Sequence, residues 1–200
     1  MLKSSHTSDL LEAGLDEVGR GCLAGPVVAC AVVLPKEYTN SLLNDSKKMS
    51  VKSRLLVAED IKKHALAYAI AEVSPQEIDQ INILNASFLA MHKALDKINL
   101  DINLLLVDGN RFTPYKNINH LCIVKGDSKY LSIAAASVLA KNYRDKLMSN
   151  LAIEHPFYSW DKNAGYPTKV HRLGIAANGI TIWHRMSFRL LPPQIEIPYK

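Results

Sequence analysis

The segment that most constrains the fold is INLLLVDGN, residues 102–110, in which an aliphatic run stops abruptly at Asp108 and Gly109. A strand that is apolar throughout is buried on both of its faces, and such burial requires helices on both sides of the sheet. The segment therefore predicts an α/β fold with a central sheet. Residues 118–127, INHLCIVKGD, repeat the pattern and predict a second strand of the same kind, which stops at Gly126 and Asp127.

Three further segments have the length and composition of strands. Residues 10–17 and 26–35 are apolar and are joined by a glycine-rich loop, so they predict an antiparallel hairpin. Residues 65–73 alternate weakly between apolar and polar and predict a third strand. Five strands of this kind predict a central mixed sheet flanked by helices.

Helix start signals separate the predicted strands. Ser50 is placed as the N-cap of a helix over residues 51–64, and Ser74 with Glu77 forms a capping-box pattern that starts the next helix. Helical periodicity returns over residues 82–99 and 132–155, and a last helix is predicted to start near Thr168. We therefore expect one domain over residues 1–200, with a helical C-terminal portion from about residue 160.

Charge and cysteine content narrow the class of protein. The chain has 24 Lys and Arg against 19 Asp and Glu, a formal net charge of +5, which makes a polyanionic partner such as nucleic acid plausible without establishing one. The three cysteines form no C-x-x-C pair, which argues against a structural zinc site and a secreted disulfide framework. The sequence also lacks the apolar segment of a signal peptide or a membrane span, so we expect a cytoplasmic protein.

Acidic residues stand where three of the predicted strands end. They are Asp16 with Glu17, Asp108, and Asp127. If those strands are neighbours, four carboxylates meet at one edge of the sheet, where like charges raise one another's pKa unless a cation lies between them. The alternative is that each Asp caps a turn, but the consecutive pair Asp16 and Glu17 weighs against it, because alternation sends one of the two toward the core.

Oxygen ligands without cysteine or paired histidine favour Mg²⁺ or Mn²⁺ over zinc. Two such ions can activate a water molecule and stabilise the leaving oxygen of a phosphodiester, which is the chemistry of a nuclease. The loop of residues 19–25, called here the glycine loop, begins with Gly19, Arg20 and Gly21. Its glycines allow the backbone to approach a ligand closely, and such a loop could contact a ribose 2′-OH, the group that separates RNA from DNA. The loop matches neither a P-loop nor a dinucleotide fingerprint.

Several long blocks resemble the ribonuclease HII family in order and spacing. The blocks are GLDEVGRGCLAGPVVACAVVL, NDSKKMS, EIDQINILNASFLAMHKAL, LLVDGN, VKGDSKYLSIAAASVLAKNYRD, AGYPTKVH and HRMSF. The resemblance implies a ribonuclease H-like fold and Mn²⁺- or Mg²⁺-dependent endonucleolytic cleavage. The implied substrates are RNA–DNA hybrids, cut in the RNA strand, and duplex DNA with single embedded ribonucleotides, with 5′-phosphate and 3′-hydroxyl ends. The resemblance also implies a role in DNA replication and in ribonucleotide excision repair.

The resemblance further implies roles for individual residues. The metal-binding and catalytic carboxylates fall on Asp16, Glu17, Asp108 and Asp127; the loop that contacts the 2′-OH falls on Gly19, Arg20 and Gly21; the tyrosine that stacks on the adjoining deoxyribose falls on Tyr166. Asp145 matches a family position near the metals, although it could equally be an arginine partner on an exposed helix face. Cys22 departs from the proline that the family usually has directly after the Gly-Arg-Gly stretch.

Other candidates are weaker. Lys47 and Lys129 are expected to contact substrate phosphates, and without the family match Tyr166 would be read as a packing residue. His171 and His184 are expected to be structural, because a two-metal mechanism needs no histidine base. We expect a monomer that binds hybrid or ribonucleotide-containing duplexes and no membrane. The competing functions are a DNA-directed nuclease or resolvase and a nucleic-acid-binding module without activity.

Overall fold

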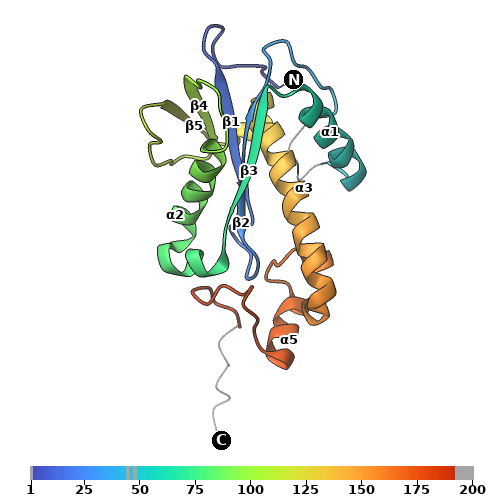
Figure 1. Ribbon diagram of the computed structural model, residues 1–200. Helices are drawn as coiled ribbons and strands as arrows, with labels where there is room; N and C mark the ends of the chain where they lie inside the picture. Colours follow the sequence, from blue (N-terminus) through green and yellow to red (C-terminus); the bar gives the residue numbers. More distant parts are fainter. Residues whose placement is uncertain (1, 44–45, 47–48, 192–200) are drawn as a thin grey trace, which may run out of the picture.

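The computed structural model describes residues 2–43, 46 and 49–191, which form a sheet with helices on both faces (Figure 1). The strands are β1 (Glu12–Val18), β2 (Val27–Val33), β3 (Ala67–Val73), β4 (Leu104–Asp108) and β5 (Asn119–Ile123). The helices are α1 (Val51–His64), α2 (Pro75–Leu95), α3 (Leu131–Glu154), α4 (Trp160–Asn163) and α5 (Lys169–Asn178), with short 3₁₀ turns η1 (Gly126–Ser128) and η2 (Pro156–Tyr158).

The sheet is mixed and has the strand order β3-β2-β1-β4-β5. β1 pairs antiparallel with β2, and β2 pairs antiparallel with β3, which confirms the predicted hairpin and third strand. β4 lies parallel to β1 on its other side, and β5 lies parallel to β4. The sheet therefore brings β1 and β4, two of the acid-bearing strands, side by side at its centre.

Each face of the sheet has its own hydrophobic core. Ala13 and Leu15 on β1 face α2, together with the buried apolar side of that helix. On the opposite face, Val28 and Cys30 of β2 pack against α1 and α3. Gly14 also faces α3, and a Cβ there would lie 2.2 Å from the backbone of Ser132, so the absence of a side chain lets α3 approach β1 closely.

The predicted helix caps are confirmed. The Ser50 hydroxyl accepts a hydrogen bond from the Ser53 N–H, and Ser74 with Glu77 forms both bonds of a capping box. The helix that starts after Ser74 and the helical spacing from residue 82 belong to one helix, α2, which is kinked at Asn82 (φ 65°, ψ 164°). The Asn82 Oδ1 accepts hydrogen bonds from two following backbone N–H groups and so starts the second part of the helix.

Three details of the predicted strands are wrong. β5 ends at Ile123 and lies at the edge of the sheet, so its residues are exposed or only partly buried. Asp127 therefore does not end a strand but lies in η1, because Lys125 adopts a left-handed conformation (φ 56°) that turns the chain. Asp16 and Glu17 lie within β1, which continues to Val18. Of the four acids, Asp108 is the one that ends its strand.

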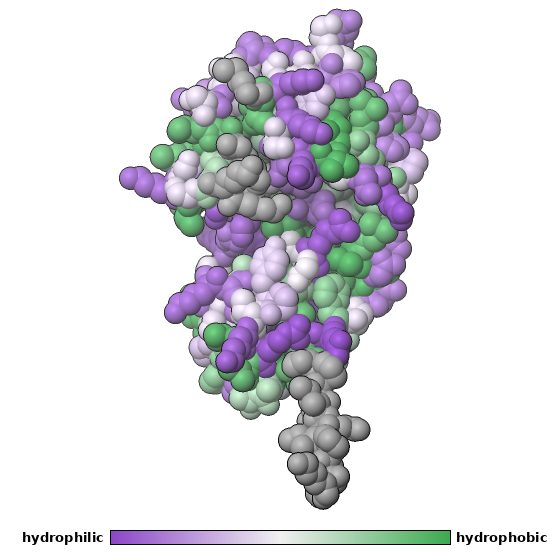
Figure 2. All heavy atoms as spheres, turned by 180° about the vertical axis from the view of Figure 1, so that it is seen from behind, coloured by the Kyte–Doolittle hydropathy of each residue, from purple (hydrophilic) through white to green (hydrophobic). Residues whose placement is uncertain are grey.

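The C-terminal portion is helical from residue 160, as expected, and packs below the sheet in Figure 1. Its core contains Trp160 and Ile175, which contact Leu23 and Ala24 of the glycine loop and Met148 of α3. None of the described helices is long and apolar enough to cross a membrane. Figure 2 shows the side opposite to that of Figure 1, where hydrophilic side chains gather across the middle of the face.

Candidate active site

Asp16 is buried on the face of β1 that packs against α3, with 6% of its surface exposed. Its Oδ1 accepts a 2.7 Å hydrogen bond from the N–H of Glu17, and the Ser137 hydroxyl on α3 donates a second bond to the carboxylate. Burial is the main cause of a pKa well above the ordinary range for an aspartate, and the charges of Glu17 and Asp108 raise it further. Asp16 is therefore held among other carboxylates in a place that disfavours its charged form.

Asp108 lies beside Asp16 because the register of β1 and β4 pairs Leu15 with Val107. The Asp108 Oδ1 accepts a 2.7 Å hydrogen bond from the N–H of Gly126. That bond fixes the start of η1 against the end of β4, and Asp127 follows directly with 6% of its surface exposed. The fold thus brings Asp108 to the Asp16–Glu17 pair and places Asp127 on the turn that is bonded to Asp108.

Different donors hold the carboxylates of this acidic site. Glu17 forms a 3.2 Å ion pair with Arg20, while Asp16 and Asp108 accept the bonds described above. In the described part of the chain, no three His, Cys, Asp or Glu side chains gather tightly enough to hold a metal ion as they stand. The oxygen-only donor set of the four acids suits a hard divalent cation.

The glycines of the glycine loop have different roles. Gly19 has φ +95°, and a Cβ there would lie 2.3 Å from the Arg144 Nε, so this glycine makes room for an arginine of the protein itself. Among the described residues, a Cβ on Gly21 would meet only the Tyr166 ring, at 3.9 Å. Gly21 is therefore the position of the Gly-Arg-Gly stretch at which the backbone is open to a ligand.

Two buried arginines, Arg144 and Arg185, for which the sequence predicts no role, hold the glycine loop. Arg144 on α3 donates to the carbonyls of Ala24, Pro26 and Ala164, at 2.7–2.9 Å. Arg185 donates to the carbonyls of Gly25 and Arg20, at 2.8–3.0 Å. A signal for Arg144 exists, because it shares the helical spacing of the buried residues Ala140, Met148 and Leu151. We find no comparable signal for Arg185.

Tyr166 lies in the turn between α4 and α5 and is 39% exposed. Its ring lies beside Gly21, and its side chain forms a hydrogen bond with the Cys22 thiol. Cys22 is fully buried, and burial raises the pKa of its thiol. The structure therefore places Tyr166 next to the glycine loop, with the residue partly exposed to solvent.

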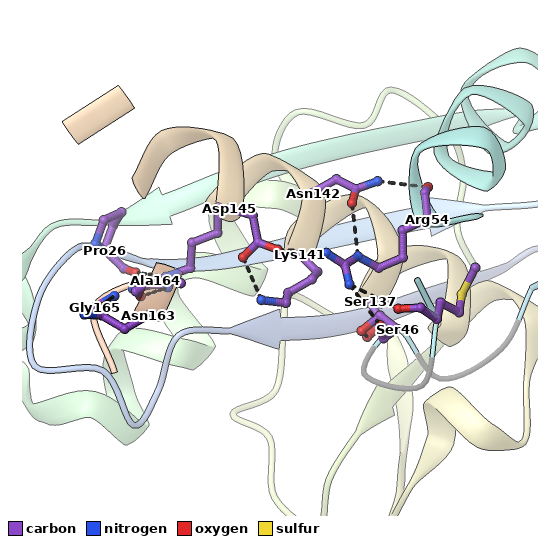
Figure 3. A network of polar contacts seen from close by, with 12 residues as sticks. Pro26, Ser46, Arg54, Ser137, Lys141, Asn142, Asp145, Asn163, Ala164 and Gly165 are labelled. Atoms are coloured by element: carbon purple, nitrogen blue, oxygen red, sulfur yellow. Dashed lines mark hydrogen bonds and ion pairs between the residues drawn. The ribbon is translucent and has the colours of Figure 1, made fainter. Parts of the chain in front are cut away.

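Asp145 faces cations rather than the other acids. It forms ion pairs with Arg54 of α1 at 2.9 Å and with Lys141 at 2.6 Å, as Figure 3 shows. The network continues to the acidic site through Ser46, whose hydroxyl lies 2.9 Å from that of Ser137. Ser137 is buried on α3, and its hydrogen bond to Asp16 links this network to the acidic site.

The remaining candidates lie outside this group. Lys129 is exposed and follows η1 directly, two residues beyond Asp127, while Lys47 falls outside the described residues. His171 and His184 are buried together beside Trp160, and burial lowers the pKa of both imidazoles, that of His184 to about 4. They are kept in the neutral form, away from the acids.

Known structures place this fold in a class. The chain is similar to the ribonuclease H2 of Pyrococcus horikoshii OT3 with a TM-score of 0.73 at 23% identity, covering 90% of this chain and 94% of that one. It is also similar to a chain of the PCNA:RNase HII complex from Archaeoglobus fulgidus with a TM-score of 0.72 at 26% identity, covering 93% and 98%. The fold is ribonuclease H-like, as expected.

The sequence comparisons identify the family. The ribonuclease HII family model matches residues 13–191. The ribonuclease HII of Bacteroides thetaiotaomicron is 59% identical over 191 residues, 96% of each chain, and that of Phocaeicola vulgatus is 55% identical over 201 residues, the full length of both. The chain therefore belongs to the ribonuclease HII family of ribonuclease H-type endonucleases.

Proposed function

We propose that this chain hydrolyses the RNA strand of RNA–DNA hybrids and incises duplex DNA at single embedded ribonucleotides, leaving 5′-phosphate and 3′-hydroxyl ends. Family membership supports ribonuclease H-type endonuclease activity. The finer specificity is supported by the position of the glycine loop, whose Gly21 is open to a ligand and lies beside the partly exposed ring of Tyr166.

The residues proposed to hold Mn²⁺ or Mg²⁺ are Asp16, Glu17, Asp108 and Asp127. Their oxygen donors suit hard cations, and the neighbouring charges that raise the pKa of Asp16 favour occupation by a cation. A related fold, Bst-RNase HIII, has been solved in complex with Mn²⁺. When bound, two such ions supply activation of a water molecule and stabilisation of the leaving 3′-oxygen.

The protein's own groups orient these acids. The Glu17 N–H and the Ser137 hydroxyl hold the Asp16 carboxylate, and the Gly126 N–H holds that of Asp108. Because these donors belong to β1, α3 and η1, the carboxylates keep their orientation before substrate arrives. Preorganisation of this kind lowers the cost of assembling the reacting groups around the phosphate.

Substrate recognition is proposed to divide between sugar and phosphate. Gly19, Arg20 and Gly21 contact the 2′-OH of the ribonucleotide, and Tyr166 stacks on the adjoining deoxyribose. Lys129, exposed beside η1, and Lys47 contact substrate phosphates. The net charge of +5 favours a polyanionic partner. The single-domain organisation and the monomeric state remain predictions from the sequence.

The observation that carries the proposal is the placement of the glycine loop and Tyr166 together, next to the acidic site. The test is incubation of the purified protein with an end-labelled DNA duplex that bears one ribonucleotide, in Mn²⁺, Mg²⁺ or chelator, followed by mapping of the cut. We expect metal-dependent incision at the ribonucleotide and an intact all-DNA duplex of the same sequence. Equal cleavage of both duplexes would favour a DNA-directed nuclease, and binding without cleavage in any metal would favour an inactive binding module.

A further inference from the structure

One short segment of the C-terminal portion pairs with the glycine loop. The Gly25 N–H donates to the Trp183 carbonyl at 2.8 Å, and the Arg185 N–H donates to the Leu23 carbonyl at 2.9 Å. Between these bonds, His184 forms an isolated antiparallel bridge with Ala24. The backbone of residues 183–185 is thus fixed against residues 23–25, and the side chains of His184 and Arg185 start from a defined position.

Arg185 extends from this segment under the glycine loop. Its Nε and one terminal nitrogen both donate to the Gly25 carbonyl, and the other terminal nitrogen donates to the Arg20 carbonyl at 2.9 Å. The side chain is fully buried. One planar guanidinium therefore ties the end of the glycine loop to Arg20, beside the open Gly21.

His184 reaches the other loop through His171. The Trp160 indole N–H can only donate, and it donates to the His171 Nε2 at 3.0 Å, so the proton of His171 is on Nδ1. That Nδ1–H donates to the Tyr166 carbonyl at 2.9 Å. The imidazole thus anchors the backbone of Tyr166 in one orientation.

The tautomer of His184 follows in the same way. Its Nδ1 accepts a 2.9 Å hydrogen bond from the Thr181 N–H, which leaves the proton on Nε2. That Nε2–H points to the His171 Nε2, 3.3 Å away. The Trp160 indole N–H and the His184 Nε2–H therefore share the His171 Nε2 as acceptor, and the chain of bonds from His184 to Tyr166 has one assignment of protons.

We propose that His184 and Arg185 are positioning residues with separate targets. His184, acting through His171, fixes the position of Tyr166, and Arg185 fixes the position of the glycine loop. Neither side chain touches substrate. Because the two residues are consecutive, one buried segment fixes the spacing between the two elements that read the sugar on each side of the cut. The inference rests on the proposed function of the glycine loop and Tyr166.

The segment is itself anchored to the far side of the sheet, which keeps this spacing rigid. Asp79 on α2 accepts hydrogen bonds from the N–H groups of Met186 and Ser187, at 2.8 and 2.9 Å. Helix α2 packs on the face of the sheet opposite to α3. The glycine loop and Tyr166 are therefore both held in fixed positions relative to the sheet and α2.

A double-mutant cycle tests the proposal. The variants His184→Gln and Arg185→Lys are each made in the wild-type chain and in Tyr166→Ala, and kcat and KM are measured for the duplex with one ribonucleotide. Each variant is expected to lower kcat/KM by about tenfold in the wild-type chain, since small displacements of positioning groups have effects of this order or larger. In the Tyr166→Ala chain, His184→Gln is expected to have an effect of less than about twofold, while Arg185→Lys keeps its full effect.

Equal effects of both variants in the two backgrounds would overturn the proposal, because a general loss of stability acts alike in each. If His184→Gln does not fold, His171→Asn and His171→Ala replace it, since the Asn amide can donate near the position of Nδ1 and is expected to restore most of the activity that Ala loses. An Asn variant no better than Ala would also contradict the proposal.

The matched control is Arg172→Lys. Arg172 also donates to backbone carbonyls of the C-terminal portion, those of Arg189 and Leu190, and these two bonds reach neither the glycine loop nor Tyr166. We expect its kcat/KM to stay within about twofold of wild type. A wild-type chain that leaves the ribonucleotide intact would instead show failure of the proposed function, which separates the two outcomes.

Discussion

The acidic site and the glycine loop lie side by side but are stabilised in opposite ways. At the acidic site, neighbouring carboxylates raise the pKa of Asp16, so part of the site is unfavourable in the absence of a cation. At the glycine loop, Arg144 and Arg185 together donate six hydrogen bonds to five backbone carbonyls. The comparison indicates that hydrogen bonds hold the glycine loop in place without substrate, whereas we propose that a metal ion completes the acidic site.

The largest effect is expected from breaking the acidic site. Asp108→Asn keeps the acceptor for the Gly126 N–H but removes a charge, so we expect kcat to fall by roughly a thousandfold, as loss of several kcal/mol of metal-dependent stabilisation implies. The measurement is Mn²⁺-dependent cleavage of the ribonucleotide-containing duplex.

The matched control is Asp145→Asn, which changes an acid paired with Arg54 and Lys141. Because those contacts are structural, we expect a change in kcat of less than about threefold and a loss of stability of about 1 kcal/mol or less. A loss of activity as large as that of Asp108→Asn would show that Asp145 belongs to the acidic site.

The second prediction concerns the support of Tyr166 by His184, which we expect acid to weaken. Burial lowers the pKa of His184 from 6.5 to about 4. Above pH 6.5 the imidazole is neutral in both states, but between pH 6.5 and 4 the unfolded chain binds a proton that the folded chain excludes. The free energy of unfolding therefore decreases as the pH is lowered through this window, by up to about 3 kcal/mol from this group.

Urea unfolding at pH 7, 5.5 and 4.5 measures this loss. The control is His184→Gln, in which acidic residues titrate as before but the buried imidazole is gone. We expect a smaller loss of stability with acid in the variant than in the wild-type chain. Parallel pH dependences would show that His184 takes up its proton without cost to the fold.

The third prediction separates two glycines of one loop. Gly19→Ala forces a side chain toward the Arg144 Nε at φ +95°, so we expect a loss of about 2 kcal/mol in stability. Gly21→Ala enters open space beside Tyr166, so we expect stability within about 0.5 kcal/mol of wild type and a raised KM for the ribonucleotide duplex. Thermal unfolding measures the stability of the two variants, and steady-state kinetics measure their KM. Equal destabilisation by Gly19→Ala and Gly21→Ala would contradict the separate roles.

Much of this fold could be predicted from local patterns. The hairpin, the caps at Ser50 and Ser74 and the buried strand before Asp108 follow from periodicity and capping chemistry, which act over a few residues. The position of β5 at the sheet edge could not be predicted, because strand order depends on contacts across the whole chain. For the same reason the left-handed Lys125, which moves Asp127 into a 3₁₀ turn, gave no local signal.

The acids of the site could be selected from the sequence because charges beside apolar runs are conspicuous. The residues that hold these acids and the glycine loop in place could not be selected in this way. Arg144, Arg185 and Ser137 act on partners more than a hundred residues away in sequence, and a buried arginine that binds carbonyls looks like any other arginine until the loop it holds is in place. Positioning groups of this kind are recognisable only from tertiary structure.

The central claim is that the acidic site is unfavourable alone and is completed by a divalent cation. Because the pKa of Asp16 is raised in the folded state, its charged form opposes folding at neutral pH. Thermal unfolding of the wild-type chain and Asp16→Asn, each with chelator and with excess Mn²⁺, tests the claim directly. With chelator we predict that the variant melts higher by roughly 2–4 °C, the shift that 1 kcal/mol produces in a chain of this size. With Mn²⁺ we predict that the wild-type chain gains stability and the variant does not. A variant that is less stable in chelator, with Mn²⁺ raising both melting temperatures equally, would contradict the account.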